Sequence, residues 1–284
     1  MKKSFITIYT LLLLGCGYLQ AQSIDLLPEK SFTSGIEGPA TDKEGNIYVV
    51  NFGKEGTIGK VSPDGKAELF VELPATSIGN SIRINPKGHL IVADYTNHNL
   101  LEIDPATKHI KVYAHSGKMN QPNDLALSSL TGIIYASDPN WKETKGQLWA
   151  IYPDGACKLI EPDMGTTNGI ELSPDNKTLY VNESAQLNLW KYDVDSKGKL
   201  SNKKLIHKFE GYGLDGMKCD KNGNIYVTRY DKGTVEVLNP QGGKIKEFTL
   251  KGKQPSNLTF SPDETKLYVT LQDRGTIEII NLKQ

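Results

Sequence analysis

The sequence predicts an all-β protein, a six-bladed β-propeller with four strands in each blade. A turn-plus-strand signature recurs six times along the 284 residues, and its aligned strand positions lie 43, 44, 45, 46 and 42 residues apart. Short apolar runs separated by Gly, Asn and Asp-Pro turns surround these positions, without a helix-length amphipathic stretch. Self-similarity at this period is typical of propeller blades. The aligned positions are Tyr48, Ile91, Tyr135, Tyr180, Tyr226 and Tyr268.

The repeats differ in how clearly they match. Residues 42–49 and 220–227 agree at seven of eight positions, and residues 173–181 and 261–269 form a second matching pair. Weaker copies at 85–92 and 128–136 fill the gaps. Six repeats therefore predict six blades.

The last repeat predicts how the ring closes. It ends just after a third strand, 276–281, and lacks an outermost strand. Residues 24–32 precede the first repeat, at the place that outer strands such as 67–73 occupy in other repeats. An open ring would expose sheet edges. We therefore expect the N-terminal strand to complete the last blade, within a single domain over residues 22–284.

The first 21 residues lie outside the repeats. Lys2 and Lys3 precede an apolar stretch, 5–14, that is too short to span a bilayer as a mature helix, which indicates an export signal peptide over residues 1–21. The protein would then be periplasmic or secreted. In the alternative interpretation, residues 1–15 are a lipoprotein signal, and a lipid on Cys16 anchors the protein to a membrane without a spanning segment.

The composition excludes one class of partner. The chain is 38% hydrophobic and has a formal net charge of zero, which suits a globular protein and provides no basic field for nucleic acid.

A residue with a side-chain oxygen stands five positions before each repeat signature. Alone, an Asn or Asp beside Gly is most often a turn former. Six equivalent polar residues at strand starts instead indicate side chains that converge on one axis, where they would form a site for a hard cation. These axial residues are Glu37, Asn80, Asn123, Asn168, Asp215 and Ser256.

A second ring of polar residues is predicted around the axial ones. The second strand of each blade returns to the same face, and its end, three positions after the aligned strand residue, carries Asn51, Asp94, Asp138, Glu183 and Arg229. The alternative is a solvated or hydrogen-bonded layer that does not touch substrate. The longest loop on this face, 138–147, carries Trp141 and is expected to cover a substrate.

Five short motifs resemble those of a known family. The chain is similar to the gluconolactonase/regucalcin (senescence-marker-protein) family of six-bladed, calcium-dependent lactonases over essentially all of the mature sequence. The motifs are Glu37-Gly-Pro39, Gln121-Pro-Asn-Asp124, Asp138-Pro139, Asn168-Gly169 followed by Ser173-Pro-Asp175, and Leu214-Asp-Gly216.

The resemblance implies roles for individual residues. It implies that Glu37, Asn123, Asn168 and Asp215 bind the metal and that Asp215 also acts as acid-base or nucleophile. The family's sugar-lactone members commonly carry an Arg where this chain has Gln121, which bears on the identity of the substrate. The residues expected to contact the substrate are Asn80, Gln121, Asp138, Trp141, Glu183 and Arg229.

This ligand set has a chemical logic. Two carboxylates and two amide oxygens suit one Ca²⁺ ion, with Mg²⁺, Mn²⁺ or Zn²⁺ as alternatives. A bound cation would polarise a lactone carbonyl and stabilise the tetrahedral intermediate. Asp215 would assist a water nucleophile or attack directly, and both routes stay open.

The predicted function is therefore an exported, metal-dependent hydrolase that opens a lactone of a sugar acid or a similar small cyclic ester. One alternative is hydrolysis of another ester, such as an organophosphate, in the same site. The other is a non-catalytic propeller that binds a ligand or a protein. Two carboxylates on one axis argue against the last, because binding alone does not need them.

Overall fold

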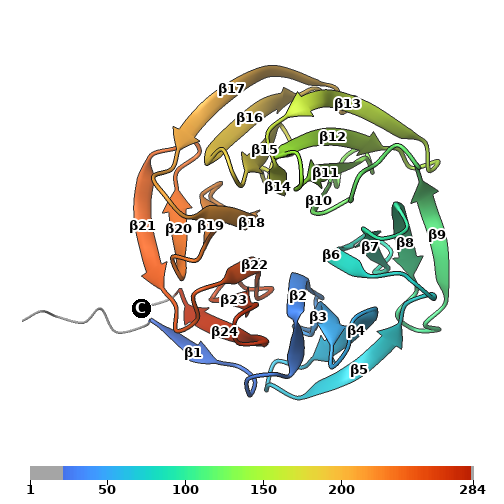
Figure 1. Ribbon diagram of the computed structural model, residues 1–284, viewed down its shortest axis with the longest axis vertical. Helices are drawn as coiled ribbons and strands as arrows, with labels where there is room; N and C mark the ends of the chain where they lie inside the picture. Colours follow the sequence, from blue (N-terminus) through green and yellow to red (C-terminus); the bar gives the residue numbers. More distant parts are fainter. Residues whose placement is uncertain (1–21, 283–284) are drawn as a thin grey trace, which may run out of the picture.

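The computed structural model describes residues 22–282, which form six four-stranded antiparallel sheets arranged as a ring (Figure 1). The predicted six-bladed propeller is confirmed. Every regular element within residues 22–282 is a strand, so no helix there is long and apolar enough to cross a membrane.

Each blade runs from an innermost strand at the axis to an outermost strand at the rim. The first blade consists of β2 (Phe32–Thr41), β3 (Ile47–Phe52), β4 (Thr57–Val61) and β5 (Ala67–Glu72). The second consists of β6 (Gly79–Ile84), β7 (Leu90–Asp94), β8 (Asn99–Ile103) and β9 (Ile110–His115). The third consists of β10 (Leu125–Leu127), β11 (Ile134–Asn140), β12 (Lys145–Ile151) and β13 (Cys157–Met164).

The remaining blades repeat this order. The fourth consists of β14 (Thr167–Leu172), β15 (Thr178–Glu183), β16 (Asn188–Val194) and β17 (Leu200–Lys208). The fifth consists of β18 (Gly213–Cys219), β19 (Ile225–Tyr230), β20 (Thr234–Leu238) and β21 (Lys244–Thr249). The sixth consists of β22 (Pro255–Phe260), β23 (Lys266–Leu271), β24 (Thr276–Asn281) and β1 (Ser23–Asp25).

The two ends of the described chain close the ring. β1 pairs antiparallel with β24, where Ile24 lies opposite Ile279, so blue and red strands adjoin in Figure 1. The predicted closure by the N-terminal strand is confirmed. The predicted range 24–32 was too long, because β1 ends at Asp25 and Phe32 already begins the innermost strand of the first blade. Arg274 holds the junction through an ion pair to Asp25 at 2.7 Å.

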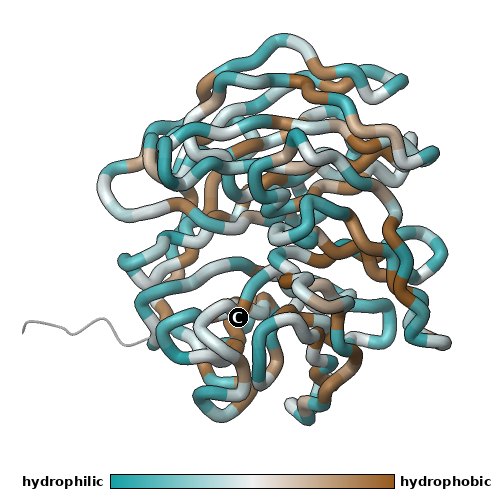
Figure 2. Tube along the Cα trace, turned by 45° about the vertical axis from the view of Figure 1, so that its right-hand side comes forward, coloured by the Kyte–Doolittle hydropathy of each residue, from teal (hydrophilic) through white to brown (hydrophobic). Residues whose placement is uncertain are grey.

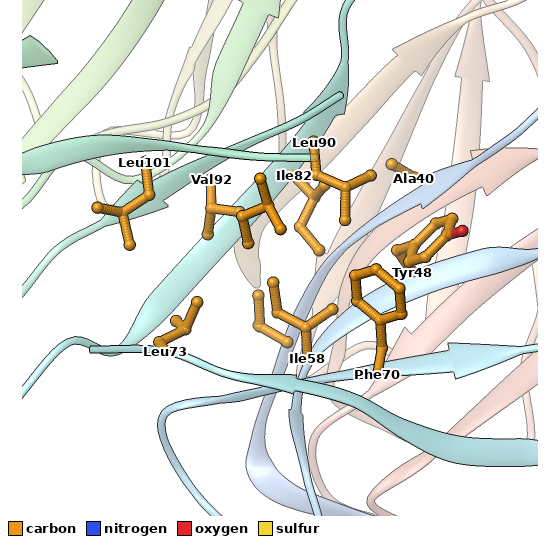
Figure 3. Packing of buried hydrophobic residues seen from close by; sticks show 11 residues of the cluster. Ala40, Tyr48, Ile58, Phe70, Leu73, Ile82, Leu90, Val92 and Leu101 are labelled. Carbon is orange, nitrogen blue, oxygen red and sulfur yellow. The ribbon is translucent and has the colours of Figure 1, made fainter. Parts of the chain in front are cut away.

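The hydrophobic core lies between the blades. Each of six buried clusters occupies the interface of two neighbouring blades, because strand residues alternate between the two faces of a sheet. Figure 3 shows the cluster between the first two blades, where the rings of Tyr48 and Phe70 meet edge to face at 5.0 Å. Figure 2 shows hydrophilic residues on the loops that project from the surface, and apolar stretches alternating with hydrophilic ones along the rest of the chain. The packed blades thus form a rigid frame around the axis.

Candidate functional site

β-Bulges occur at or beside five of the six axial residues; the exception is Asn123, which precedes β10. Register shifts span Asn80 in β6, Asn168 in β14, Asp215 in β18 and Ser256 in β22, and shifts lie on both sides of Glu37 in β2. A bulge bends its strand and changes the direction of a side chain. The repeated signal in the sequence therefore corresponds to a repeated local distortion that frees polar side chains from the sheet.

Three of the residues that directly follow an axial residue are glycines that leave no room for a Cβ. A Cβ on Gly216 would lie 2.1 Å from Cγ of Asn257 on the next blade. Gly38 has φ of 51°, and a Cβ there would lie 2.2 Å from the backbone Cα of Ser81. Neighbouring innermost strands therefore touch at these points, which explains why Gly follows Glu37 and Asp215.

One end of the axis opens into a cavity of about 430 Å³. Five of the six predicted axial residues line this cavity, namely Glu37, Asn80, Asn123, Asn168 and Asp215. Ser256 does not line it. Its buried Oγ donates a hydrogen bond of 2.8 Å to the carbonyl oxygen of Ile36, so Ser256 joins the last blade to the first.

Two buried carboxyl groups dominate the electrostatics of the cavity. Burial, reinforced by the charge of Asp124, raises the pKa of Glu37 to about 8. Burial and the adjoining Glu37 also raise the pKa of Asp215 well above its usual value. Asp124 itself is compensated by Arg83, whose Nη2 lies 2.8 Å from the Asp124 carboxylate. The Glu37–Asp215 pair therefore resists ionisation, and a bound cation would favour the ionised form of both carboxyl groups.

The amide groups beside this pair fit a metal ligand set. Oδ1 of Asn123 is buried and has no hydrogen-bond partner among residues 22–282, which is costly unless a ligand satisfies it. Nδ2 of Asn168 donates to the carbonyl oxygen of Leu214 at 3.3 Å. The described residues contain no group of three His, Cys, Asp or Glu side chains placed to hold a metal. A set of two carboxylates and two amides is consistent with that finding, because it contains only two such side chains.

Three of the six predicted substrate contacts line the cavity. They are Asn80, Gln121 and Trp141, the last with 46% of its surface exposed. Trp141 lies in the turn between β11 and β12. This turn is shorter than the predicted loop 138–147, because residues 138–140 and 145–147 extend the two strands and pair with each other.

Asp138 does not line the cavity. Its carboxylate is fully buried and accepts hydrogen bonds from the backbone N–H groups of Asn120 and Gln121 and from Nε1 of Trp149, at 2.6 to 2.9 Å. Asp138 therefore fixes the segment that carries Gln121 and acts behind the cavity wall.

Glu183 and Arg229 are also absent from the lining. Glu183 accepts a hydrogen bond from the N–H of Gly165 at 2.8 Å. Arg229 pairs with Glu236 at 2.6 Å and lies over the ring of Phe209. Glu183 and Arg229 therefore belong to a hydrogen-bonded layer behind the cavity wall, as in the alternative interpretation of the second ring.

Several lining residues that the pattern missed lie one position after the predicted ring, at the ends of the second strands or directly beyond them. Side chains of successive strand residues point to opposite faces, so a prediction that is one residue off selects the buried face. Asn51, within the predicted ring, does line the cavity and has φ of 67°. The residues found one position later are Tyr95, Ser184, Tyr230 and Gln272; Gly35 and Glu55 also line the cavity.

A family model described as the SMP-30/gluconolactonase/LRE-like region matches residues 36–273. The chain is 30% identical to the gluconolactonase of Zymomonas mobilis over 241 residues, which cover 72% of this chain and 67% of the relative. It is 27% identical to the diisopropyl-fluorophosphatase of Loligo vulgaris over 263 residues, covering 80% of this chain and 82% of that protein. The crystal structure of a calcium-binding protein, regucalcin, from Agrobacterium tumefaciens superposes with a TM-score of 0.78 at 21% identity, covering 90% of this chain and 92% of that chain.

Proposed function

The chain belongs to the SMP-30/gluconolactonase/LRE-like family, and from that premise we propose that it is a metal-dependent lactonase acting on an uncharged lactone of a sugar acid. The observation that carries the proposal is the buried pair of carboxyl groups, Glu37 and Asp215, beside the unpartnered Oδ1 of Asn123. Binding of a neutral ligand alone would not repay the burial of two interacting carboxyl groups.

Glu37, Asn123, Asn168 and Asp215 would hold the metal ion. An oxygen-only donor set favours Ca²⁺ over ions that prefer nitrogen or sulfur. When bound, the ion supplies Lewis-acid polarisation of the ester carbonyl and stabilises the negative charge that develops on its oxygen.

Asp215 is the candidate for proton transfer. Its carboxylate would take the proton of the attacking water and return it to the alcohol oxygen of the opened ring. It lines the cavity together with Glu37, Asn123 and Asn168, so its carboxylate would lie within reach of a water that attacks the ester carbonyl there. Asn182 donates to the Asp215 backbone carbonyl at 2.6 Å and so helps to fix its position.

The charge of the cavity favours an uncharged substrate. None of the described residues that line it is Lys, Arg or His, whereas Glu37, Glu55 and Asp215 are acidic. Gln121 stands where sugar-lactone members of the family commonly carry Arg, so a phosphorylated or carboxylated lactone would find no cationic partner here. Amide and hydroxyl groups, including those of Gln121 and Ser184, instead offer partners for sugar hydroxyls.

The test is a pH-stat assay of a panel of neutral aldonolactones and their phosphorylated counterparts. We expect hydrolysis of the neutral lactones, its loss in excess EDTA and its recovery with Ca²⁺. Unchanged turnover in EDTA would contradict the metal role, and an absence of turnover across the panel with Ca²⁺ would contradict the lactonase.

A second reaction belongs in the same panel. The similarity to a diisopropyl-fluorophosphatase and the lack of cationic lining residues are both compatible with an uncharged phosphotriester. Comparison of kcat/KM for phosphotriesters and lactones would decide which ester is the preferred substrate.

We also propose that the protein is exported. The supporting observation is the sequence of residues 1–21, where Lys2 and Lys3 precede the apolar stretch 5–14. These residues, Cys16 among them, lie outside the described part of the chain. Mass spectrometry of the mature protein would distinguish an N-terminus at Gln22 from a lipidated Cys16, and an intact N-terminus in the cytoplasmic fraction would refute export.

A further inference from the structure

A second hollow of about 590 Å³ adjoins the catalytic cavity. Gln121 and Trp141 line both spaces, so the two are neighbours across these side chains. We call this space the outer hollow. A molecule seated over the catalytic cavity can therefore extend past Gln121 and Trp141 without leaving the surface of the protein.

The floor of the outer hollow is held in place. Met119 and Pro139 line it and are buried. The adjacent backbone is fixed, because Asn120 and Gln121 donate their N–H groups to the buried carboxylate of Asp138. Nδ1 of His98 lies 2.6 Å from the carbonyl oxygen of Met119 and must donate to it. A preformed floor of this kind lowers the cost of ordering a ligand.

The polar groups around this floor combine donors and acceptors. Nε2 is the ring nitrogen of His98 that is left to contact a ligand, since Nδ1 donates to the carbonyl oxygen of Met119. The carboxamide of Asn120 makes no side-chain hydrogen bond among the described residues and offers both a donor and an acceptor. Oδ1 of Asn140 accepts from the N–H of Glu143, which leaves its amino group as a donor.

Trp141 adds an exposed aromatic surface between the two spaces. A sugar ring has apolar C–H faces that pack on an aromatic ring, and hydroxyl groups that both donate and accept hydrogen bonds at its edge. An acyl chain would leave His98, Asn120 and Asn140 without partners, at a cost in desolvation. Lys142 is the only Lys or Arg among the described residues that line the outer hollow, which is a weak basis for binding an anion.

We propose that the outer hollow binds a glycosyl group, so that the preferred substrate is a disaccharide aldonolactone. Its lactone ring would occupy the catalytic cavity and its second sugar ring the outer hollow. The inference rests on the proposed lactonase function and narrows its substrate class.

The test compares kcat/KM for glucono-1,5-lactone with the values for cellobiono-, maltobiono- and lactobionolactone in the presence of Ca²⁺. We expect at least one disaccharide lactone to be preferred by roughly 10-fold or more. Asn120→Ala should lower that preference roughly 3- to 10-fold, as expected for one lost hydrogen bond. Asn202→Ala, on the outer strand of the fourth blade, is the matched control and should preserve it.

A binding experiment separates this inference from the lactonase function. Calorimetric titration with cellobiose, maltose or lactose should show tighter binding than titration with glucose, and Asn120→Ala should reduce the difference. Tighter disaccharide binding without lactone turnover would sustain the outer hollow and reject the lactonase. Equal binding of mono- and disaccharides, or a preference that Asn120→Ala leaves unchanged, would overturn the glycosyl site.

Discussion

Substitution of Glu37 by Gln should change how the stability of the metal-free protein depends on pH. The native pKa of Glu37 is about 8, against 4.5 for the free side chain. Between these values the folded chain binds a proton that the unfolded chain releases, so the wild-type protein loses stability as the pH rises through this window. At about 1.4 kcal/mol per pKa unit, the loss is on the order of 3 kcal/mol at pH 7 and 5 kcal/mol above pH 8.

Glu37→Gln keeps the shape of the side chain and removes its titration. In EDTA, the variant should match the wild type near pH 5 and be more stable by several kcal/mol at pH 8, a difference in Tm on the order of 10 °C. Thermal and urea unfolding between pH 5 and 8 measure this difference. Added Ca²⁺ should stabilise only the wild type, because a ligand that binds the folded state raises its stability.

The control is Glu68→Gln, which removes an exposed carboxylate on β5. The difference in stability between Glu68→Gln and the wild type should be the same at every pH from 5 to 8. The reasoning would be refuted if the stability difference between Glu37→Gln and the wild type in EDTA were also constant from pH 5 to pH 8.

Three further substitutions test the site, the blade contacts and the ring closure. Asp215→Asn at saturating Ca²⁺ should lower kcat about 10²- to 10⁴-fold, whereas near wild-type kcat would show that Asp215 only holds the metal. Gly38→Ala should lower Tm well beyond Gly53→Ala, because both glycines have positive φ but only Gly38 meets the next blade; equal losses would contradict this contact. Arg274→Leu should destabilise the protein by about 3 kcal/mol or more. It should also abolish the hydrogen-exchange protection of the Leu26 N–H, which donates to the carbonyl oxygen of Ile277. Retained protection would contradict the role of Arg274 in holding the ring closed.

The sequence predicts the fold well because the repeat is itself the architecture. Each signature marks one blade, and the missing outer strand of the sixth repeat required residues from the N-terminus. The axial positions could also be predicted from the sequence, since each lies at the same distance from its repeat signature. Ser256 shows the limit of that reasoning. It has the same register, but its hydroxyl donates a hydrogen bond to the backbone carbonyl of Ile36 and does not line the cavity.

The rest of the cavity wall depends on local twists that a repeat does not encode. Tyr230 lines the cavity while Arg229, one residue earlier, is buried against Phe209, and only the direction of each strand end decides between them. Asn257 is a similar case. Its side chain hydrogen-bonds Glu37 from the sixth blade, although it lies one residue beyond the predicted register.

The pairing of β1 with β24 has a consequence for the order of folding. β1 is the first strand to leave the ribosome, and its partner is the last, so the ring cannot close until residue 281 has been synthesised. Until then the site is incomplete, because its parts come from separate blades. A cation bound by groups from several blades would then stabilise only the closed ring, because an open chain cannot bring those groups together.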